Sequence, residues 1–205
     1  MTFEEYLLEH PIRINKDADF EEHPEGLVIS LLSRKVLEAD YDEINNNFIT
    51  IDTQKLSLYK HSRLDYYIIG FFIPEDNNRF GIITNISFRK APESKSNTKI
   101  LPFVKPIAIQ TIHTTTEWRG HGISSKLYHY IVNDLGYTII SDAVQFKGAV
   151  ALWKRFPEVK GCSVYIYNIT EDKIISKYTS NTPDSHVWSD DTSKMSIRLV
   201  FTKSI

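Results

Sequence analysis

One stretch of the chain has the residue types of an anion-binding turn. From Thr114 to Ser124 it reads T-T-T-E-W-R-G-H-G-I-S, with Gly120 and Gly122 separated by a single residue. Two such glycines let the backbone turn tightly and approach a ligand without a Cβ in the way. Free N–H groups at a helix N-terminus, with the positive end of the helix dipole, favour a diphosphate. Arg119, directly before the glycines, can add a permanently charged, bidentate contact.

Glycine pairs also occur in plain tight turns before helices, so the flanking sequence decides between the two interpretations. Ile107–Thr114 alternates between two faces, which is typical of a strand. After the loop, apolar residues recur with helical spacing and Gly136 stands where a C-terminal cap is expected; they are Ile123, Leu127, Tyr130, Ile131 and Leu135. A strand, a loop and an amphipathic helix in this order favour phosphate binding.

The loop resembles the acyl-CoA pyrophosphate loop of the GNAT superfamily of N-acetyltransferases, whose pattern is Gln/Arg-x-x-Gly-x-Gly/Ala. Arg119 takes its first position, Gly122 its fourth and Ser124 its sixth, where serine is a mild departure. The resemblance implies acetyl-CoA as co-substrate, with its diphosphate on the loop and its pantetheine amides on the strand before it. The implied cofactor-binding residues are Ile112, His113, Thr114, Arg119, Gly120, His121, Gly122, Ile123, Ser124 and Trp153.

The resemblance continues downstream, with two departures. Ala149–Trp153 (A-V-A-L-W) is similar to the family's Ala-x-x-Leu-Tyr helix, which lies along the pantetheine arm. Trp153 replaces the tyrosine that often protonates the leaving thiolate, and an indole has no titratable proton. Phe146 replaces the usual asparagine three residues before the alanine. The sequence from Ser141 to Trp153 is also similar to that of acetyltransferase-like proteins of tailed phages. The specific resemblance to the superfamily covers residues 107–156.

The implied fold is α+β, a GNAT-like central mixed, mostly antiparallel sheet with splayed strands and flanking helices. Runs of β-branched and aromatic residues independently predict an antiparallel meander: Phe48–Ile51, Leu56–Tyr59, Tyr66–Ile73 and Gly81–Phe88. Further strands are predicted at Tyr137–Ser141, Ser163–Asn168, Lys173–Lys177 and Ser196–Phe201, and a short helix at Gly148–Phe156. The whole chain, 1–205, is expected to form a single GNAT-like domain with its acetyl-CoA-binding core at 107–156.

Three other stretches carry weaker predictions. Residues 1–45 are expected to be mostly helical, from the apolar spacing in Phe3-Tyr6-Leu7 and Val28-Leu31-Leu32-Val36. The run Pro74–Asn78 is rich in turn-forming residues. Ala91–Lys99 is polar, contains a proline, and is expected to be an exposed loop.

Two residues are candidates for the base that an amine acceptor needs. His113 lies at the end of the strand beside the expected thioester, and an unperturbed imidazole titrates near neutrality. Asp142 follows the neighbouring strand. Each has a structural alternative: His113 can face the core or solvent, and Asp142 can serve as a helix cap or turn residue. Glu117 suits a solvent-facing loop role, and His121 suits contact with the cofactor.

Composition excludes several classes of protein. The net charge of −2 argues against binding nucleic acid by charge alone, although a local basic patch stays open. The histidines show no metal-ligand spacing, so no metal is predicted. One cysteine, Cys162, suits a reducing compartment and is expected to be buried or at a strand edge. The acidic N-terminus and the absence of an 18-residue apolar run predict a cytoplasmic protein without membrane contact.

The resemblance implies an N-acetyltransferase that transfers an acetyl group from acetyl-CoA to an amine by direct attack. The acceptor is not identified; a small amine, a protein lysine or N-terminus, and a modified base all stay open, as does a homodimer. The alternative is a non-catalytic GNAT-like domain that binds acyl-CoA or a protein partner, which Trp153 supports. A nucleotide-binding domain is weaker, because neither a strand–GxGxxG–helix nor a GxxxxGK[ST] pattern is present.

Overall fold

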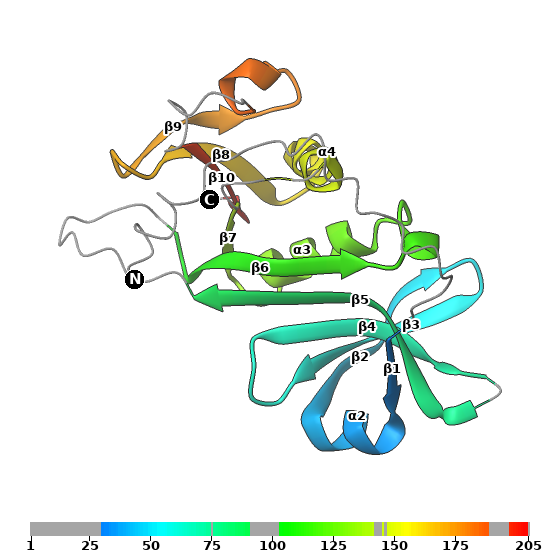
Figure 1. The fold of residues 1–205 in the computed structure, drawn as a ribbon. Coiled ribbons are helices and arrows are strands. Elements are labelled where there is room, and N and C mark those ends of the chain that lie inside the picture. The colour runs from blue at the N-terminus through cyan, green and yellow to red at the C-terminus, as the bar shows by residue number, and fades with distance from the viewer. Residues whose placement is uncertain are drawn as a thin grey trace. The chain divides into compact units, whose positions relative to one another are not determined.

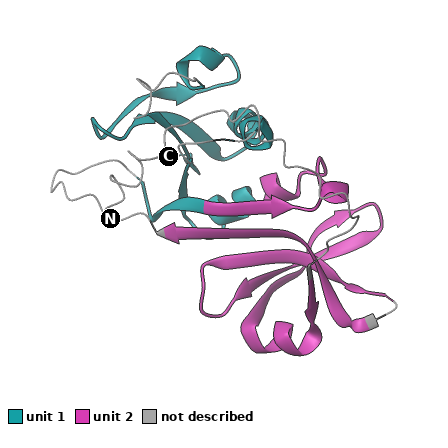
Figure 2. Ribbon diagram, viewed as in Figure 1, with its two compact units in different colours: residues 1–22, 90–109, 127–205 teal, residues 23–89, 110–126 magenta. Residues whose placement is uncertain are grey.

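The computed structural model describes residues 30–74, 76–90, 103–141, 145, 147–188 and 197–204. The protein is α+β, with a sheet that is mostly antiparallel. Its chain divides into two compact units: unit 1 is 1–22, 90–109 and 127–205, and unit 2 is 23–89 and 110–126 (Figure 2). Strand β6 (Pro106–Thr114) and helix α3 (Ile123–Asn133) each have residues in both units.

Unit 2 is built on the predicted antiparallel meander, which is confirmed. Its strands pair in sequence order (Figure 1), and they are β2 (Tyr41–Ile51), β3 (Gln54–His61), β4 (Tyr66–Ile73) and β5 (Asp76–Lys90). Strand β1 (Ser30–Ser33) pairs antiparallel with β5 and leads into helix α2 (Arg34–Asp40). Ser33 caps this helix, since its hydroxyl accepts a hydrogen bond from the amide of Val36 at 3.3 Å.

Apolar residues of the meander form the core of unit 2. Leu56, Leu58, Ile68 and Phe80 are fully buried, as the β-branched and aromatic character of these strands predicts. The ring of Tyr59 packs edge-on against Phe80 with centroids 5.1 Å apart. Burial of such side chains is the main force that holds the strands together.

Unit 1 contains the one parallel strand pair found in the described residues. β6 pairs with β7 (Thr138–Ile140) from Pro106 to Ala108, and α3 is the crossover that a parallel connection requires. The order continues with antiparallel strands β10 (Ile197–Lys203), β8 (Cys162–Asn168) and β9 (Lys173–Tyr178). The predictions of these strands are confirmed, with ends shifted by a residue or two.

An aromatic cluster holds the helices of unit 1 onto its sheet. The short helix predicted at Gly148–Phe156 corresponds to helix α4 (Lys147–Arg155) and the first residue of the 3-10 turn η2 (Phe156–Glu158). Phe156 stacks on Phe201 of β10 with centroids 4.4 Å apart, and Trp153 and Tyr128 each contact Phe156 at 5.1 Å. The predicted cap at Gly136 is confirmed by its left-handed φ of 70°.

The prediction of a helical N-terminal region is wrong over its described part, except for α2. Residues 1–29 lie outside the described residues. Ser30–Ser33 is strand β1, in which Leu31 is opposite Gly81 and Leu32 opposite Phe80. Backbone pairing with β5 therefore overrides the helical spacing, and β2 already begins at Tyr41.

The predicted turn at Pro74–Asn78 is also shorter than expected. Only Pro74 is described as a turn residue, and β5 begins at Asp76, which pairs with Ile73. The register between β4 and β5 is irregular here, because it changes between the pair Ile73–Asp76 and the pair Phe72–Phe80. The predicted loop Ala91–Lys99 lies outside the described residues.

We expect Gly70→Ala to destabilise the protein by more than about 2 kcal/mol. Gly70 lies on β4 against Gly81 of β5, and an added Cβ would fall well inside contact distance of the Gly81 carbonyl oxygen. Gly148→Ala on α4 is the matched control, because no atom lies within 4 Å of its added Cβ. Urea unfolding followed by circular dichroism measures both; equal stability of the two variants would contradict the close approach.

We also expect stability to depend on Tyr59 at alkaline pH. Burial, and then the Glu43 carboxylate beside it, raise the pKa of Tyr59 from 10.0 to about 12. Because the folded pKa lies above the unfolded one, this contribution to stability is complete below about pH 10 and is lost as pH rises through about 12. The free energy of unfolding should fall more steeply over this range in the wild type than in Tyr59→Phe. Urea titrations at closely spaced pH values measure this free energy for both proteins. If it falls with pH at the same rate in the wild type and in Tyr59→Phe, the pKa of Tyr59 is not raised.

Candidate functional site

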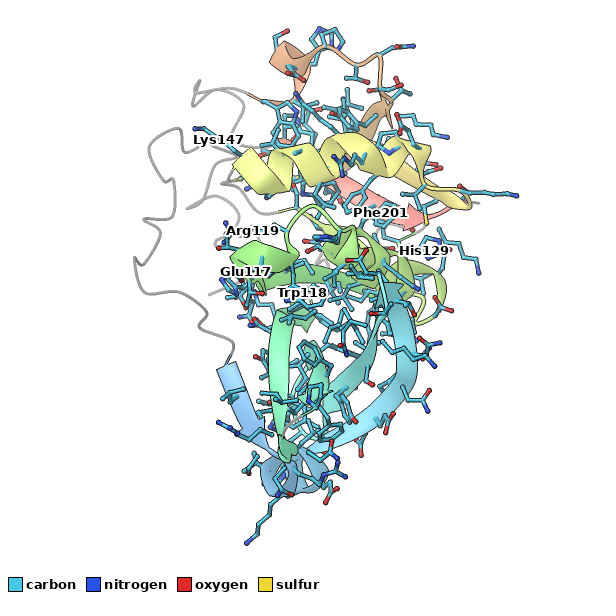
Figure 3. All side chains as sticks on the ribbon, turned by 90° about the vertical axis from the view of Figure 1, so that its right-hand side faces the viewer. Glu117, Trp118, Arg119, His129, Lys147 and Phe201 are labelled. Carbon is cyan, nitrogen blue, oxygen red and sulfur yellow. The ribbon has the colours of Figure 1, made fainter. Side chains whose placement is uncertain are left out.

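The predicted anion-binding loop follows the end of β6 in unit 2. The amide of Thr115 donates to the carbonyl of Ile83 on β5 at 2.9 Å, which holds the start of the loop against the sheet. A 3-10 turn, η1 (Thr116–Trp118), comes next, and Arg119 closes it by donating its amide to Thr116 at 3.2 Å. Glu117, Trp118 and Arg119 lie together on this turn (Figure 3).

The two glycines both adopt a conformation that other residues avoid. Gly120 has a φ of 82° and Gly122 a φ of 77°, in the left-handed region where a Cβ is strained. No atom lies within 4 Å of a Cβ built on either residue. The backbone therefore faces open space at both positions, so a ligand can approach it closely.

The loop has a run of backbone donors without partners among the described residues. Within the described part of the chain, the amides of residues 120–125 donate no backbone hydrogen bond, and the first helical bond runs from Lys126 to the carbonyl of Gly122 at 3.0 Å. Helix α3 has no acidic residue in its first turn. Orphan amides at a helix N-terminus, with no carboxylate to fill them, form a site for an anion.

Arg119 is oriented toward the same loop. Its Nε donates to the carbonyl of Thr114 at 3.0 Å, and the side chain is exposed. No described residue accepts a hydrogen bond from its two Nη groups. The Nε contact fixes the plane of the guanidinium while its remaining donors stay open to a ligand.

Three hydroxyl groups connect the loop to the sheet. Thr84 on β5 donates to Thr114 at 3.1 Å, and the hydroxyls of Thr114 and Ser124 are also 3.1 Å apart. Either of these two hydroxyls can donate to the other. Thr84 is fully buried, and the sequence analysis missed it; a threonine within the apolar run G-I-I-T-N-I was the available signal.

His121 lies between the two glycines and beside Trp118. Its Nδ1 is 3.1 Å from the carbonyl of Arg119, which can only accept, so Nδ1 carries a proton. In the neutral ring, Nε2 is then left as an acceptor. The rings of Trp118 and His121 are 6.3 Å apart, and Trp118 also contacts Phe71 at 5.9 Å. These aromatic groups form one side of the loop in unit 2.

The two predicted bases are placed unequally. His113 is exposed on β6, one residue before Thr114, and no described side chain hydrogen bonds to its ring. Asp142 lies outside the described residues. Ser141 before it is buried and held by β10, since its amide donates to the Leu199 carbonyl at 2.8 Å and its hydroxyl accepts from the Leu199 amide at 3.0 Å.

Trp153, predicted to contact the cofactor, is a core residue of unit 1. Its side chain is 2% exposed, and its ring packs edge-on against Tyr128 and Phe156. The cofactor contact stays a prediction, but the described packing gives the indole a structural role. Phe146, where the resemblance expects an asparagine, lies outside the described residues.

The lone cysteine is buried, as predicted. Burial raises the pKa of the Cys162 thiol, because a thiolate would lose its solvation, although Asn133 donates to Sγ at 3.2 Å. Asn133 also lies 2.6 Å from Nε2 of His129. A protonated, buried thiol is not a nucleophile.

Comparisons of the chain with protein-family models, curated proteins and solved structures found no match. Among the helices that the structure describes, none is long and apolar enough to cross a membrane. The same residues contain no group of three His, Cys, Asp or Glu side chains that could hold a metal ion. The case for a function therefore depends on the geometry of the loop.

Proposed function

We propose that the protein is an acetyl-CoA-dependent N-acetyltransferase of the GNAT type, whose loop at residues 119–125 binds the cofactor diphosphate. One observation carries the proposal: consecutive unpaired amides follow an exposed arginine and surround two left-handed glycines. The combination of strand, loop and helix is the one that the sequence pattern R-G-H-G-I-S predicts.

The charges of the loop suit a diphosphate. The amides of residues 120–125 lie at the positive end of the α3 dipole, and the Nη groups of Arg119 add a permanent charge. The chain as a whole has a net charge of −2, so attraction to the ligand is local. A site without acidic residues in its first helical turn gains from each phosphate charge that it binds.

The strand before the loop can accommodate the rest of the cofactor. The pairing of β6 with β7 ends at Ala108, whereas β6 continues to Thr114. The backbone of Ile112 and His113 is our candidate for the pantetheine amides. Thr114 stays a predicted cofactor contact, and its carbonyl also accepts a hydrogen bond from Arg119.

Acetyl-CoA would supply a thioester, from which an unprotonated amine takes the acetyl group. The amine nitrogen bonds to the carbonyl carbon, the bond from carbon to sulfur breaks, and the amine loses a proton to a base. His113 is the described candidate for this base, because it is exposed and adjoins Thr114. Asp142 is the second candidate. Trp153 is buried and cannot supply the proton that the thiolate needs, so water is the proposed donor.

A non-catalytic acyl-CoA-binding module is the second candidate function. The packing of Trp153 among Tyr128 and Phe156 favours it, since a titratable acid is replaced by a core residue. Both candidates require cofactor binding, and only turnover of the thioester distinguishes them. An acceptor class is not part of the proposal.

The first test is calorimetric titration with acetyl-CoA. We expect micromolar affinity, which Arg119→Ala lowers by about tenfold to a hundredfold because charge-assisted hydrogen bonds are lost. Gly122→Asp should abolish binding, since it places a carboxylate among the orphan amides.

Gly161→Asp is the matched control for the glycine variant. Gly161 also has a left-handed φ, of 81°, and open space at its Cβ, but it belongs to the turn before β8. The Gly161→Asp variant should suffer the same backbone strain as Gly122→Asp but bind acetyl-CoA with the affinity of the wild type. Absence of binding by folded wild-type protein, or equal losses in both aspartate variants, would refute the proposed loop site.

The second test measures CoA release from acetyl-CoA in the presence of amines. A lysine peptide, a peptide with a free N-terminus and a small aliphatic amine cover the main acceptor classes. His113→Gln should lower the turnover rate by about a hundredfold or more while leaving acetyl-CoA affinity unchanged. His186→Gln, an exposed histidine on the 3-10 turn η3 (Asp184–His186), is the control. Unchanged turnover in His113→Gln would exclude His113 as the base; binding without turnover of any amine would favour the non-catalytic module.

A further inference from the structure

A cavity of about 430 Å³ lies in unit 2, lined by residues of α2, β2, β3 and β4. Helix α2 is at the end of this unit remote from Arg119, as the two perpendicular views show (Figures 1 and 3). Small-molecule sites have volumes of this order. The cavity uses none of the residues of the proposed cofactor loop.

The walls of the cavity are aromatic. They are formed by the rings of Tyr41, Tyr59 and Phe72, beside the buried side chain of Leu37. Tyr59 is 6% exposed and is held edge-on by Phe80, and Tyr41 is held edge-on by His61 at 5.0 Å. These ring contacts fix the orientation of both tyrosines, of which Tyr41 is the more exposed.

The rim of the cavity is acidic. Glu38, Asp42 and Glu43 line it, against the single cation Arg34. Arg34 already has partners: its Nη1 is 3.6 Å from Glu38, and its Nε donates to the carbonyl of Asn77 at 2.9 Å. The charges of Asp42 and Glu43 are therefore not matched by a cation of the lining.

Two further contacts define the local electrostatics. The guanidinium of Arg34 lies 4.2 Å from the centre of the Phe72 ring, so the wall already holds a cation of the chain itself. Lys60 is opposite Asp42 in the register of β2 and β3 but does not line the cavity, and no ion pair joins the two in the part of the chain described. Burial raises the pKa of Tyr59, and the hydrogen-bonded carboxylate of Glu43 raises it further.

We propose that this cavity binds a small organic ammonium ion, with its cationic head against the rings of Tyr41 and Tyr59 and its charge matched by Asp42 and Glu43. Aromatic faces attract a cation most when it is partly desolvated, and nearby carboxylates add a long-range attraction. An anion would meet three carboxylates and one arginine that is already paired. The inference does not depend on the proposed cofactor loop.

The test uses choline as the probe and its neutral isostere, 3,3-dimethylbutan-1-ol, as the matched ligand. Titrations of the full chain are followed by ¹H–¹⁵N NMR at constant ionic strength. We expect saturable shifts at Leu37, Tyr41 and Tyr59 with choline, and at least about tenfold weaker binding of the neutral alcohol. Sodium chloride in place of choline chloride should leave these resonances unshifted.

Variants of the exposed rim remove a carboxylate charge and keep the size of the side chain. Glu43→Gln and Asp42→Asn should each weaken choline binding by about threefold to tenfold. Asp52→Asn, on the turn between β2 and β3, is the control and should bind as the wild type does. Equal affinity for the two ligands, no saturable binding of choline, or insensitivity to both rim variants would overturn the proposal. If the protein does not bind acetyl-CoA, the proposal of an ammonium site is unaffected, because this experiment contains no acetyl-CoA.

Discussion

The hydroxyl chain from Thr84 through Thr114 to Ser124 connects β5, β6 and the first turn of α3, and the loop between them depends on it. A loop with unpaired amides gains little from its own backbone hydrogen bonds, so its shape must come from elsewhere. Here the shape comes from these side chains, from Arg119 bonded to the Thr114 carbonyl, and from the left-handed glycines. Preorganisation of this kind lowers the entropic cost of binding an anion.

Unit 2 combines two regions of opposite electrostatic character. The loop after β6 presents amides and Arg119, whereas the cavity beside α2 presents Asp42 and Glu43 with aromatic walls. Opposite charges placed together would pair with each other and bind neither class of ligand. Their separation along the meander keeps the charges of the two regions from pairing with each other.

Aromatic contacts hold the helices of unit 1 onto its sheet. Trp153 packs with Tyr128 and Phe156, and Phe156 in turn stacks on Phe201 of β10. An indole buried in this way contributes apolar area and keeps α4 against the sheet. A buried indole cannot serve as the acid of the proposed reaction, whereas the proposed base, His113, is exposed on β6.

The sequence by itself determined the strand, glycine loop and helix at 107–135, the meander and the terminal strands, because these patterns are local. The left-handed glycines and the alternation of Ile107–Thr114 need no distant partner to be recognised. Only the tertiary structure decided the rest. Leu31 and Leu32 joined a strand because β5 offered backbone partners. Trp153 became core against Tyr128, Thr84 reached Thr114, and α2 closed a cavity against Phe72 of β4, because each contact joins residues far apart in the chain, whose approach no local pattern encodes.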